Sequence, residues 1–411
     1  MRLLYTFFIH IYISAIRVSA LHSLKAKRWV EGRKNWKTKL SGFNPGKKPV
    51  VWFHAASLGE FEQGRPVIEA FRKNYPEYYL LLTFFSPSGY EIRKNYSGAD
   101  LILYLPADFS SNAIFFLDCV NPQMVFFIKY EYWFNFMNEL KLREIPLYVI
   151  SAIFRSSQHF FKPWGKWFRK QLNAVDYFFV QNDESIKLLQ SIGFQNAIIS
   201  GDTRFDRVCN VVANQESFPL IEKFSEGHKI ILAGSSWLPD ETLLANIIQQ
   251  LPDNTRIVIA PHEVDEKRIQ EIKNLFPHKT IRLSEAGHGN ISLHKILIID
   301  GIGFLSKLYR YADIAYIGGG FGKGIHNILE AAAYGVPVII GPNYARFKEA
   351  CDLVRDKGAH TVQNQEDLYK ICNKLLTDDA LWQKSSEICA NYVQEQKGAT
   401  EIIIKHVQLQ F

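Results

Sequence analysis

From residue 49 onward, short apolar runs alternate with longer stretches in which apolar and polar residues recur at helical spacing. Continuous apolar runs of four or five residues are typical of parallel strands that helices cover on both faces. The alternation predicts an α/β protein. In the first half of the chain, the candidate strands are residues 50–54, 79–83, 101–104, 124–128, 147–151 and 177–181.

The alternation lapses over residues 201–217 and then starts again. We therefore expect two doubly wound domains, residues 49–200 and 218–397, joined by a linker at 201–217. Because ligands bind beyond the carboxyl ends of the strands in such sheets, the loops that follow the strands are the places to look for chemistry. The candidate strands of the second domain are residues 229–233, 256–260, 296–299, 314–317 and 336–340.

The first 21 residues differ from the rest. Within them, residues 3–21 are interrupted by only two strongly polar side chains, His10 and Arg17. This length is close to the ~20 residues that a helix needs to span a bilayer. We expect residues 1–21 to be a membrane anchor. A cleaved signal peptide and an amphipathic helix lying in the interface remain as alternatives.

The net charge of +7 is concentrated directly after this segment. Residues 22–48 hold nine basic residues against one acid, Glu31, so the rest of the chain sums to about −1. The distribution lacks the basic stripe that nucleic-acid binding requires, which excludes nucleic acid as a partner. By the positive-inside rule, this basic juxtamembrane segment places the body of the protein on the cytoplasmic side of a membrane.

Composition indicates what kind of protein this is. With 47% hydrophobic and 22% charged residues, the 411-residue chain is typical of ordered globular proteins, and its length predicts two or three domains. The five cysteines are odd in number and show no C-x-x-C spacing, so the sequence indicates neither a disulfide framework nor a zinc knuckle. A reducing compartment fits this cysteine usage.

Two carboxylates follow strands of the first predicted domain. Glu60 lies after the first strand, where Gly59 would let the backbone turn sharply and present the carboxylate as a general base. The alternative is a capping box formed by Ser57 and Glu60 at a helix start. Glu131 follows the strand at 124–128, either as a surface acid paired with Lys129 or as a second acid of the same site.

A glycine-rich segment at residues 317–333 dominates the second predicted domain. It contains neither a Walker A loop nor a complete G-x-G-x-x-G. In a helix that begins near His326, Asn327 and Glu330 would share a face, with Glu330 on a ribose and the helix N-terminus toward a phosphate. The pattern favours a nucleotide-sugar site. An ordinary glycine-rich connection before a capped helix is the alternative.

Two further loops of the second domain offer polar groups. The loop at Ser235 presents hydroxyls and amides to an anionic ligand, or simply caps a helix. His262 stands at the end of a predicted strand, where a lone histidine is more often structural than a ligand contact. The sequence has no H-E-x-x-H, D-x-D or carboxylate cluster that would indicate a catalytic metal.

In these loops the chain resembles the 3-deoxy-D-manno-octulosonic acid (Kdo) transferases that act on lipid A precursors. The resemblance extends from about residue 50 to residue 359. It rests on several loops that agree in order: H-A-x-S-x-G-E at 54–60, T-x-x-S-P-S-G at 83–89, Y-L-P at 104–106, E-x-W at 131–133, Ser151-Ala152, G-D-T-R-F-D at 201–206, A-G-S-S at 233–236 and G-x-H-N-x-L-E-A-A at 324–332.

This resemblance implies a GT-B fold with two Rossmann-like domains, CMP-Kdo as the donor substrate, a lipid A precursor as the acceptor, and inverting transfer without a metal or a cofactor. It makes Glu60 the base that deprotonates an acceptor hydroxyl and Glu131 the second acid. The implied acceptor-side residues are Ser57, Gly59, Ser86 and Ser88. The implied donor-binding residues are Arg204, Ser235, His262, Ile302, Gly303, Gly319, His326, Asn327 and Glu330, with Glu330 on the ribose.

The resemblance also implies a location at the cytoplasmic face of the cell inner membrane, with membrane lipids as partners. Residues 398–411 are expected to pack back on the first domain. Three places depart from the family pattern: residues 260–262 lack an arginine expected near the cytidine, residues 300–305 lack an acid, and residues 131–134 read E-Y-W-F where relatives read E-L-W-P. A GT-B glycosyltransferase with a UDP-sugar donor and a non-catalytic nucleotide- or lipid-binding scaffold remain as alternatives.

Overall fold

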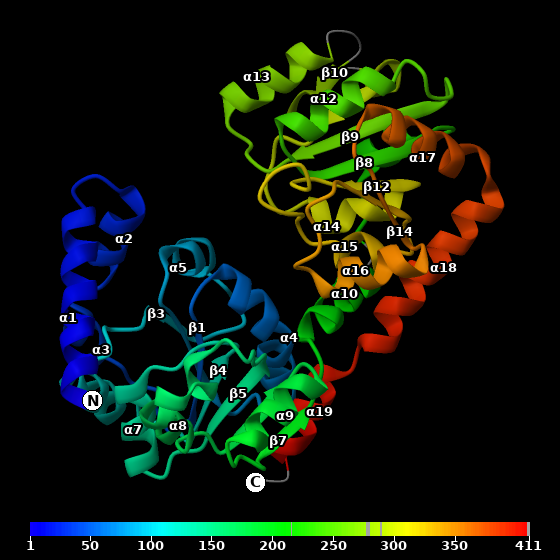
Figure 1. Ribbon diagram of the computed structural model, residues 1–411. Helices are drawn as coiled ribbons and strands as arrows, with labels where there is room; N and C mark the ends of the chain where they lie inside the picture. The colour runs from blue at the N-terminus through cyan, green and yellow to red at the C-terminus, as the bar shows by residue number, and fades with distance from the viewer. Residues whose placement is uncertain (215, 277–279, 288–289, 409–411) are drawn as a thin grey trace. The chain divides into compact units, whose positions relative to one another are not determined.

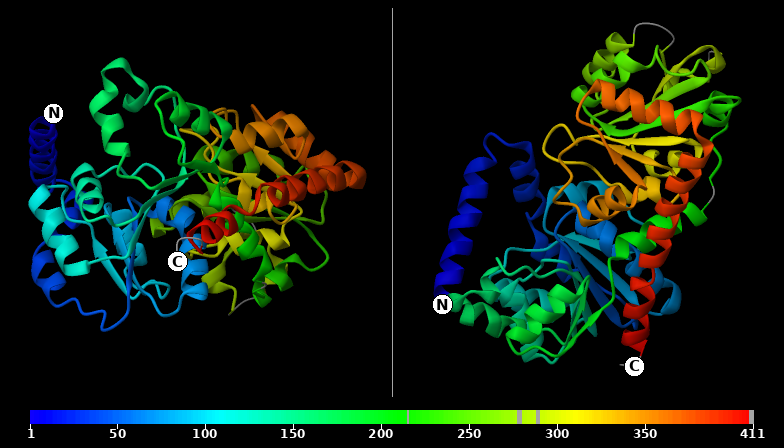
Figure 2. Two further views of the ribbon diagram at one scale, coloured as in Figure 1. Left: turned by 90° about the horizontal axis from the view of Figure 1, so that it is seen from below. Right: turned by 45° about the vertical axis from the view of Figure 1, so that its right-hand side comes forward.

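The computed structural model describes residues 1–214, 216–276, 280–287 and 290–408 (Figure 1). The chain forms two compact units: unit 1 comprises Met1–Arg207 and Gly398–Phe411, and unit 2 comprises Val208–Lys397. Residues 409–411 of the segment expected to pack back on the first domain lie outside the described residues. Each unit consists of one parallel sheet with helices on both faces (Figures 1 and 2).

The sheet of unit 1 has seven strands in the order β3-β2-β1-β4-β5-β6-β7, and all neighbouring strands are parallel. The order reverses between β1 and β4, so the loops after these two strands open next to each other at the carboxyl edge. The strands are β1 (Val50–Ala55), β2 (Tyr79–Phe84), β3 (Leu101–Tyr104), β4 (Met124–Ile128), β5 (Leu147–Ala152), β6 (Tyr177–Val180) and β7 (Ala197–Ile199).

This sheet separates two apolar cores. Along β1, Val50 and Trp52 face one core while Val51 and Phe53 face the other, and all four are buried. The helices that cover the two faces are α3 (Trp36–Ser41), α4 (Leu58–Asn74), α5 (Pro87–Arg93), α6 (Ser110–Val120), α7 (Phe134–Leu142), α8 (Lys166–Leu172), α9 (Asp183–Ser191) and α19 (Ala399–Gln408), with two 3-10 turns, η1 (His159–Phe161) and η2 (Pro163–Gly165).

Unit 2 repeats the plan with the strand order β10-β11-β9-β8-β12-β13-β14, again all parallel. Here the order reverses between β8 and β12, which makes the loops after these strands the expected ligand position. The strands are β8 (Lys229–Ser236), β9 (Thr255–Pro261), β10 (Thr280–Arg282), β11 (Ile296–Ile298), β12 (Ile314–Ile317), β13 (Val338–Ile340) and β14 (Ala359–Thr361).

The helices of unit 2 bury one apolar face of the sheet in a single large core that includes Ile231, Ile257 and Tyr316. They are α11 (Pro219–Ser225), α12 (Leu238–Ile247), α13 (Glu266–Leu275), α14 (Leu305–Leu308), α15 (Leu329–Ala332), α16 (Lys348–Asp356), α17 (Gln365–Thr377) and α18 (Asp379–Gln396), with 3-10 turns η3 (Leu283–Glu285), η4 (Ile291–Leu293) and η5 (Tyr309–Tyr311).

The apolar runs in the sequence do not predict β7, β10 and β14. Each of these strands has three residues and lies at an edge of its sheet, and such a short strand leaves no periodic signal. Residues 201–217, expected to be a linker, are largely helical, because α10 (Thr203–Ala213) occupies most of them. The division between the units falls within α10.

The N-terminal residues form a helical hairpin of α1 (Arg2–Ser19) and α2 (Leu24–Gly32) on one side of unit 1 (Figure 1). One face of α1 packs on the unit and buries Ile13. In the described part of the chain, no helix combines the length and apolar character that crossing a bilayer requires. The opposite face of α1 exposes a stripe of apolar side chains: Leu3, Leu4, Phe7, Phe8, Ile11 and Val18.

Candidate active site

Glu60 lies in the first turn of α4, directly after β1, and is half-buried. Oγ of Ser57 donates a hydrogen bond to its carboxylate and does not cap the helix backbone, so the capping-box alternative is wrong. Gly59 has no left-handed φ, so the expectation that it supplies a sharp turn is also wrong. Instead, Gly59 leaves the exposed surface beside Glu60 free of a side chain.

Glu131 follows β4 and keeps only 8% of its surface exposed. Its Oε2 accepts a hydrogen bond from Nε1 of Trp133 at 2.6 Å and lies 3.2 Å from Nε2 of the fully buried His54. When Nε2 of His54 donates to this oxygen, Nδ1 accepts from Oγ1 of Thr83 at 2.8 Å. The hydrogen bond from Trp133 and the contact with His54 therefore hold the Glu131 carboxylate in one orientation. Because Glu131 is buried, the alternative that it is a surface acid is wrong.

Cations gather around the same pair of loops. Lys129 has a left-handed φ of 71°, and burial lowers its pKa, as does the charge of Arg204, while Asp202 and Glu60 act in the opposite direction. Arg204 donates to Asp202 at 2.8 Å. The resemblance implies that Arg204 binds the donor substrate. The structure places Arg204 in unit 1, close enough to Lys129 to lower its pKa. The sequence indicated Lys129 only as a partner for Glu131.

The loop after β2 joins this arrangement through its backbone. The N–H of Ser86 donates to the carbonyl oxygen of Ala56 at 2.6 Å, and the Oγ atoms of Ser86 and Ser88 lie 3.0 Å apart at the start of α5. The predicted acceptor-side residues Ser57, Gly59, Ser86 and Ser88 therefore sit on two loops that are hydrogen-bonded to each other at the carboxyl edge of the sheet.

In unit 2, the loops after β8 and β12 are packed backbone to backbone. Ser235 adopts a left-handed φ of 52° at the end of β8. A Cβ on Gly318 would lie 2.4 Å from the carbonyl oxygen of Ser235, so only glycine permits this approach. Oδ2 of the buried Asp240 accepts from the N–H of Gly319 at 3.0 Å and from the N–H of Trp237 at 2.9 Å, and so fixes both loops.

Three rings stack at this edge of unit 2. Trp237 lies on His262 with ring centroids 4.6 Å apart, and His262 lies on His326 at 4.5 Å. Nε1 of Trp237 donates to Nε2 of His326 at 3.2 Å. Burial lowers the pKa of His326, and the neighbouring His262 lowers it further, so the stack favours a neutral His326 ring. Neither Trp237 nor Asp240 was singled out by the sequence.

Asn327 and Glu330 lie together, but not on one face of a helix that begins near His326, as expected. The helix predicted to begin near His326 is wrong, because α15 begins at Leu329 and has four residues. Oδ1 of Asn327 instead accepts from the N–H of Leu329 at 3.2 Å, and its Nδ2 donates to Glu330 at 3.0 Å.

The predicted donor residues Ile302 and Gly303 lie on the loop after β11, which is separated from β8 by β9. Ile302 exposes 85% of its surface there. In the described ranges, no group of three His, Cys, Asp or Glu side chains is placed to hold a metal ion.

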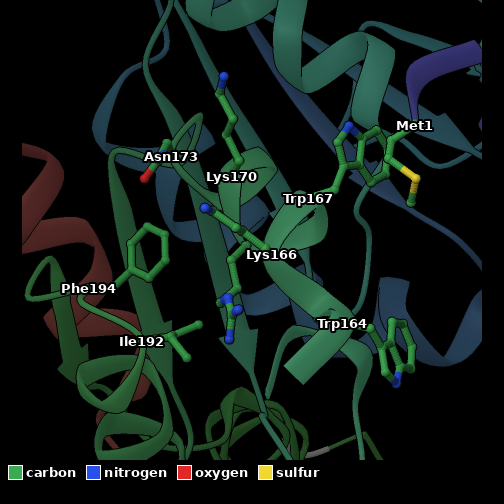
Figure 3. A pocket seen from close by; sticks show the side chains of 9 residues that line it. Met1, Trp164, Lys166, Trp167, Lys170, Asn173, Ile192 and Phe194 are labelled. Carbon is green, nitrogen blue, oxygen red and sulfur yellow. The ribbon is translucent and has the colours of Figure 1, made fainter. Parts of the chain in front are cut away.

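A surface cavity of about 720 Å³ lies elsewhere on unit 1 and includes none of the predicted site residues. Figure 3 shows Ile192 and Phe194 on one side, Trp164, Trp167 and Met1 on the other, and basic side chains between them. The basic side chains are Lys166, Arg169 and Lys170.

Comparison with known proteins shows which family this chain resembles. Residues 32–207 match the model of the 3-deoxy-D-manno-octulosonic-acid transferase (Kdo transferase) domain. A Chlamydophila psittaci 3-deoxy-D-manno-octulosonic acid transferase is 24% identical over 91% of this chain and 89% of its own length, and a Rickettsia felis protein of the same name is 26% identical over 80% of this chain and 72% of its own. Over most of its length the chain is therefore similar to the Kdo transferases. It is a glycosyltransferase.

Solved structures agree on the fold of this chain. The UDP-GlcNAc 2-epimerase of Neisseria meningitidis, bound to UDP-GlcNAc, matches 88% of this chain and 99% of its own with a TM-score of 0.62 at 17% identity. A putative UDP-N-acetylglucosamine 2-epimerase of Listeria monocytogenes matches 89% of this chain and 97% of its own with a TM-score of 0.61 at 15% identity. Two parallel seven-stranded sheets and these neighbours confirm the GT-B-like α/β architecture.

Proposed function

We propose that this protein transfers Kdo from CMP-Kdo to a hydroxyl of a lipid A precursor in lipopolysaccharide biosynthesis, with inversion and without a metal or a cofactor. Similarity to the Kdo transferases supports the identity of the transferred sugar. The observation that carries the chemistry is the position of two carboxylates, Glu60 in the first turn of α4 and Glu131 after β4, just beyond the two strands between which the strand order of unit 1 reverses.

Glu60 is the proposed base. Its carboxylate takes the proton of the acceptor hydroxyl while that oxygen bonds to the anomeric carbon of Kdo and the bond from this carbon to the phosphate oxygen of CMP breaks. The Ser57 hydroxyl, which donates to Glu60, keeps the carboxylate oriented before the acceptor arrives. Glu131, held by His54 and Trp133, is the proposed fixed charge that orients the acceptor.

The donor is proposed to bind at unit 2, at the loops after β8 and β12. Glu330 accepts hydrogen bonds from the ribose hydroxyls, with Asn327 fixing its orientation through the 3.0 Å contact. Ser235 presents its hydroxyl group, Gly319 fixes the glycine-rich loop through its N–H to Asp240, and the stacked rings provide a flat surface beside them.

We also propose attachment to the cytoplasmic face of the inner membrane. The apolar stripe on α1 and the basic residues at 22–48 support this location, because an amphipathic helix next to a basic segment binds anionic lipid surfaces. The cavity of Figure 3, with exposed Trp164 beside three cations, supports it further.

The test of the reaction is release of CMP from CMP-Kdo in the presence of a tetraacylated lipid A precursor, without added metal. We expect acceptor-dependent release by the native protein and a loss of about 100-fold or more in Glu60→Gln, because removal of a general base costs at least that much. The matched control is Glu77→Gln, which alters an exposed carboxylate of unit 1. Full activity of Glu60→Gln would overturn the mechanism, and release only from a UDP-sugar would overturn the donor.

A further inference from the structure

The N-terminal hairpin packs against the rest of unit 1 next to the loop that carries Glu131. The hydroxyl of Tyr5, on α1, donates to Oδ2 of Asp108 at 2.5 Å. The ring of Tyr5 lies 5.1 Å from that of Phe134, the first residue of α7. Asp108 keeps only 1% of its surface exposed, so the carboxylate that accepts this hydrogen bond is shielded from solvent.

Asp108 in turn holds the start of α7. Its two carboxylate oxygens accept from the N–H groups of Asn135 and Phe136, each at 3.1 Å, and its backbone carbonyl accepts from Nδ2 of Asn135 at 2.6 Å. These are the free N–H groups that a helix leaves at its N-terminus. The residue before α7 is Trp133, which donates to Glu131. A single buried carboxylate thus joins α1 to the loop that carries the proposed catalytic charge.

A second set of contacts connects the end of α2 to Trp133. Beyond the end of this helix, Arg33 donates to the carbonyl oxygens of Phe85 at 2.7 Å and Leu105 at 2.8 Å, and its guanidinium lies 3.8 Å from the ring centre of Trp29. The ring of Phe85 packs on Trp133 with centroids 4.5 Å apart. Arg33 therefore fixes the loop against which the indole of Trp133 rests.

We propose that the α1–α2 hairpin positions Glu131 for the transfer reaction, with Tyr5 and Arg33 acting as positioning residues through Asp108 and Phe85. This inference rests on the proposed function, because it assumes that Glu131 acts in catalysis. The hairpin is then more than a means of attachment. When it is seated on unit 1, both ends of the short segment from Glu131 to Phe134 are fixed, and turnover depends on that seating.

The experiment compares Tyr5→Phe and Arg33→Lys with the native protein, using CMP-Kdo and a tetraacylated acceptor dispersed in detergent so that membrane recruitment is not limiting. We expect kcat to fall by about threefold to tenfold in each, because a hydrogen bond to a charged or buried group is lost, with KM for CMP-Kdo within about twofold. We also expect faster amide hydrogen exchange in the segment at 130–137. The controls are Tyr79→Phe and Arg72→Lys, which change the same groups elsewhere in unit 1.

A further variant tests whether a loss of stability alone would lower kcat. Val407→Ala truncates a side chain in the other core of unit 1, which does not include Tyr5, Trp133 or Phe134; it should lower the melting temperature at least as much but leave kcat unchanged. Glu131→Gln tests the assumption that Glu131 acts in catalysis. If Glu131→Gln retains full kcat, the proposed role of Glu131 fails. If Glu131→Gln is impaired while Tyr5→Phe and Arg33→Lys match their controls in kcat or in exchange at 130–137, only the positioning role is overturned.

Discussion

Asp108 illustrates how burial sets the charge of a single side chain in unit 1. Burial raises the pKa of Asp108 to about 6, while the hydrogen bonds from Tyr5 and from the N–H groups of Asn135 and Phe136 act in the opposite direction. Between about pH 4 and 6 the folded protein therefore holds this proton more tightly than the unfolded chain does. The resulting stabilisation is present at low pH and is lost as the pH rises through about 6.

Asp108→Asn should remove this pH dependence, because asparagine keeps the shape but does not titrate. We expect the stability that the native protein loses between pH 4 and 7 to shrink by on the order of 2–3 kcal/mol in the variant. Thermal unfolding at several pH values measures it. The control is Glu77→Gln, which removes an exposed carboxylate. An identical pH profile for the native protein and Asp108→Asn would contradict the raised pKa.

Single residues also show what the sequence can and cannot predict. Glu60 and Glu131 are predictable as candidates because each directly follows a strand, and the carboxyl edge of a parallel sheet is known before any coordinates. The contact of Glu131 with His54 joins residues 77 positions apart, and no local pattern indicates it. The same holds for the stack of Trp237 on His262, which depends on two loops meeting in space.

At the scale of elements, unit 2 depends on one side chain that joins two loops. Asp240, in the first turn of α12, accepts from backbone N–H groups of the loops after β8 and β12 and from the hydroxyl of Tyr316 at 2.8 Å. Three donors converge on two carboxylate oxygens. An amide at this position offers one acceptor oxygen and turns its NH₂ group toward another donor.

Asp240→Asn should therefore loosen the donor side of the protein without altering Glu60 or Glu131. We expect KM for CMP-Kdo to rise by about tenfold while kcat falls by no more than about threefold, because ground-state binding of the donor is lost. Steady-state kinetics with varied CMP-Kdo measures this change. Asp253→Asn, on the exposed surface of unit 2, serves as the control. An unchanged KM would mean that these loops do not bind the donor.

The elements themselves were predictable to different degrees. Long apolar runs gave the central strands β1 and β8, because burial on both faces leaves a continuous signal. The helix expected from His326 is absent because the chain makes a glycine-rich turn up to Asn327, and Gly319 and Gly324 adopt left-handed φ values there. Glycine composition shows that such turns are possible but not where a helix begins after them.

At the scale of the whole molecule, the apolar stripe of α1 is the surface expected to contact lipid. Leu4→Ser with Phe8→Ser should lower the partition of the protein onto anionic phospholipid vesicles by about tenfold or more, since each buried apolar side chain contributes about 1.5–3 kcal/mol. Co-sedimentation with vesicles measures the change. Leu293→Ser removes an exposed leucine of unit 2 and is the control. Equal recovery of all three proteins with the vesicles would contradict attachment through α1.

The path of the chain through the two units has a consequence for how the protein is made. The chain leaves unit 1 after Arg207 and returns to it at Gly398, and Figure 2 shows α19 lying against unit 1. There, Ile403 and Val407 complete one of its cores, and Asp206 accepts from the N–H groups of Gly398 and Thr400. Unit 1 therefore cannot bury this core during synthesis until unit 2 and then α19 have been translated. A chain truncated before α19 would contain the rest of unit 1 but leave this apolar face uncovered.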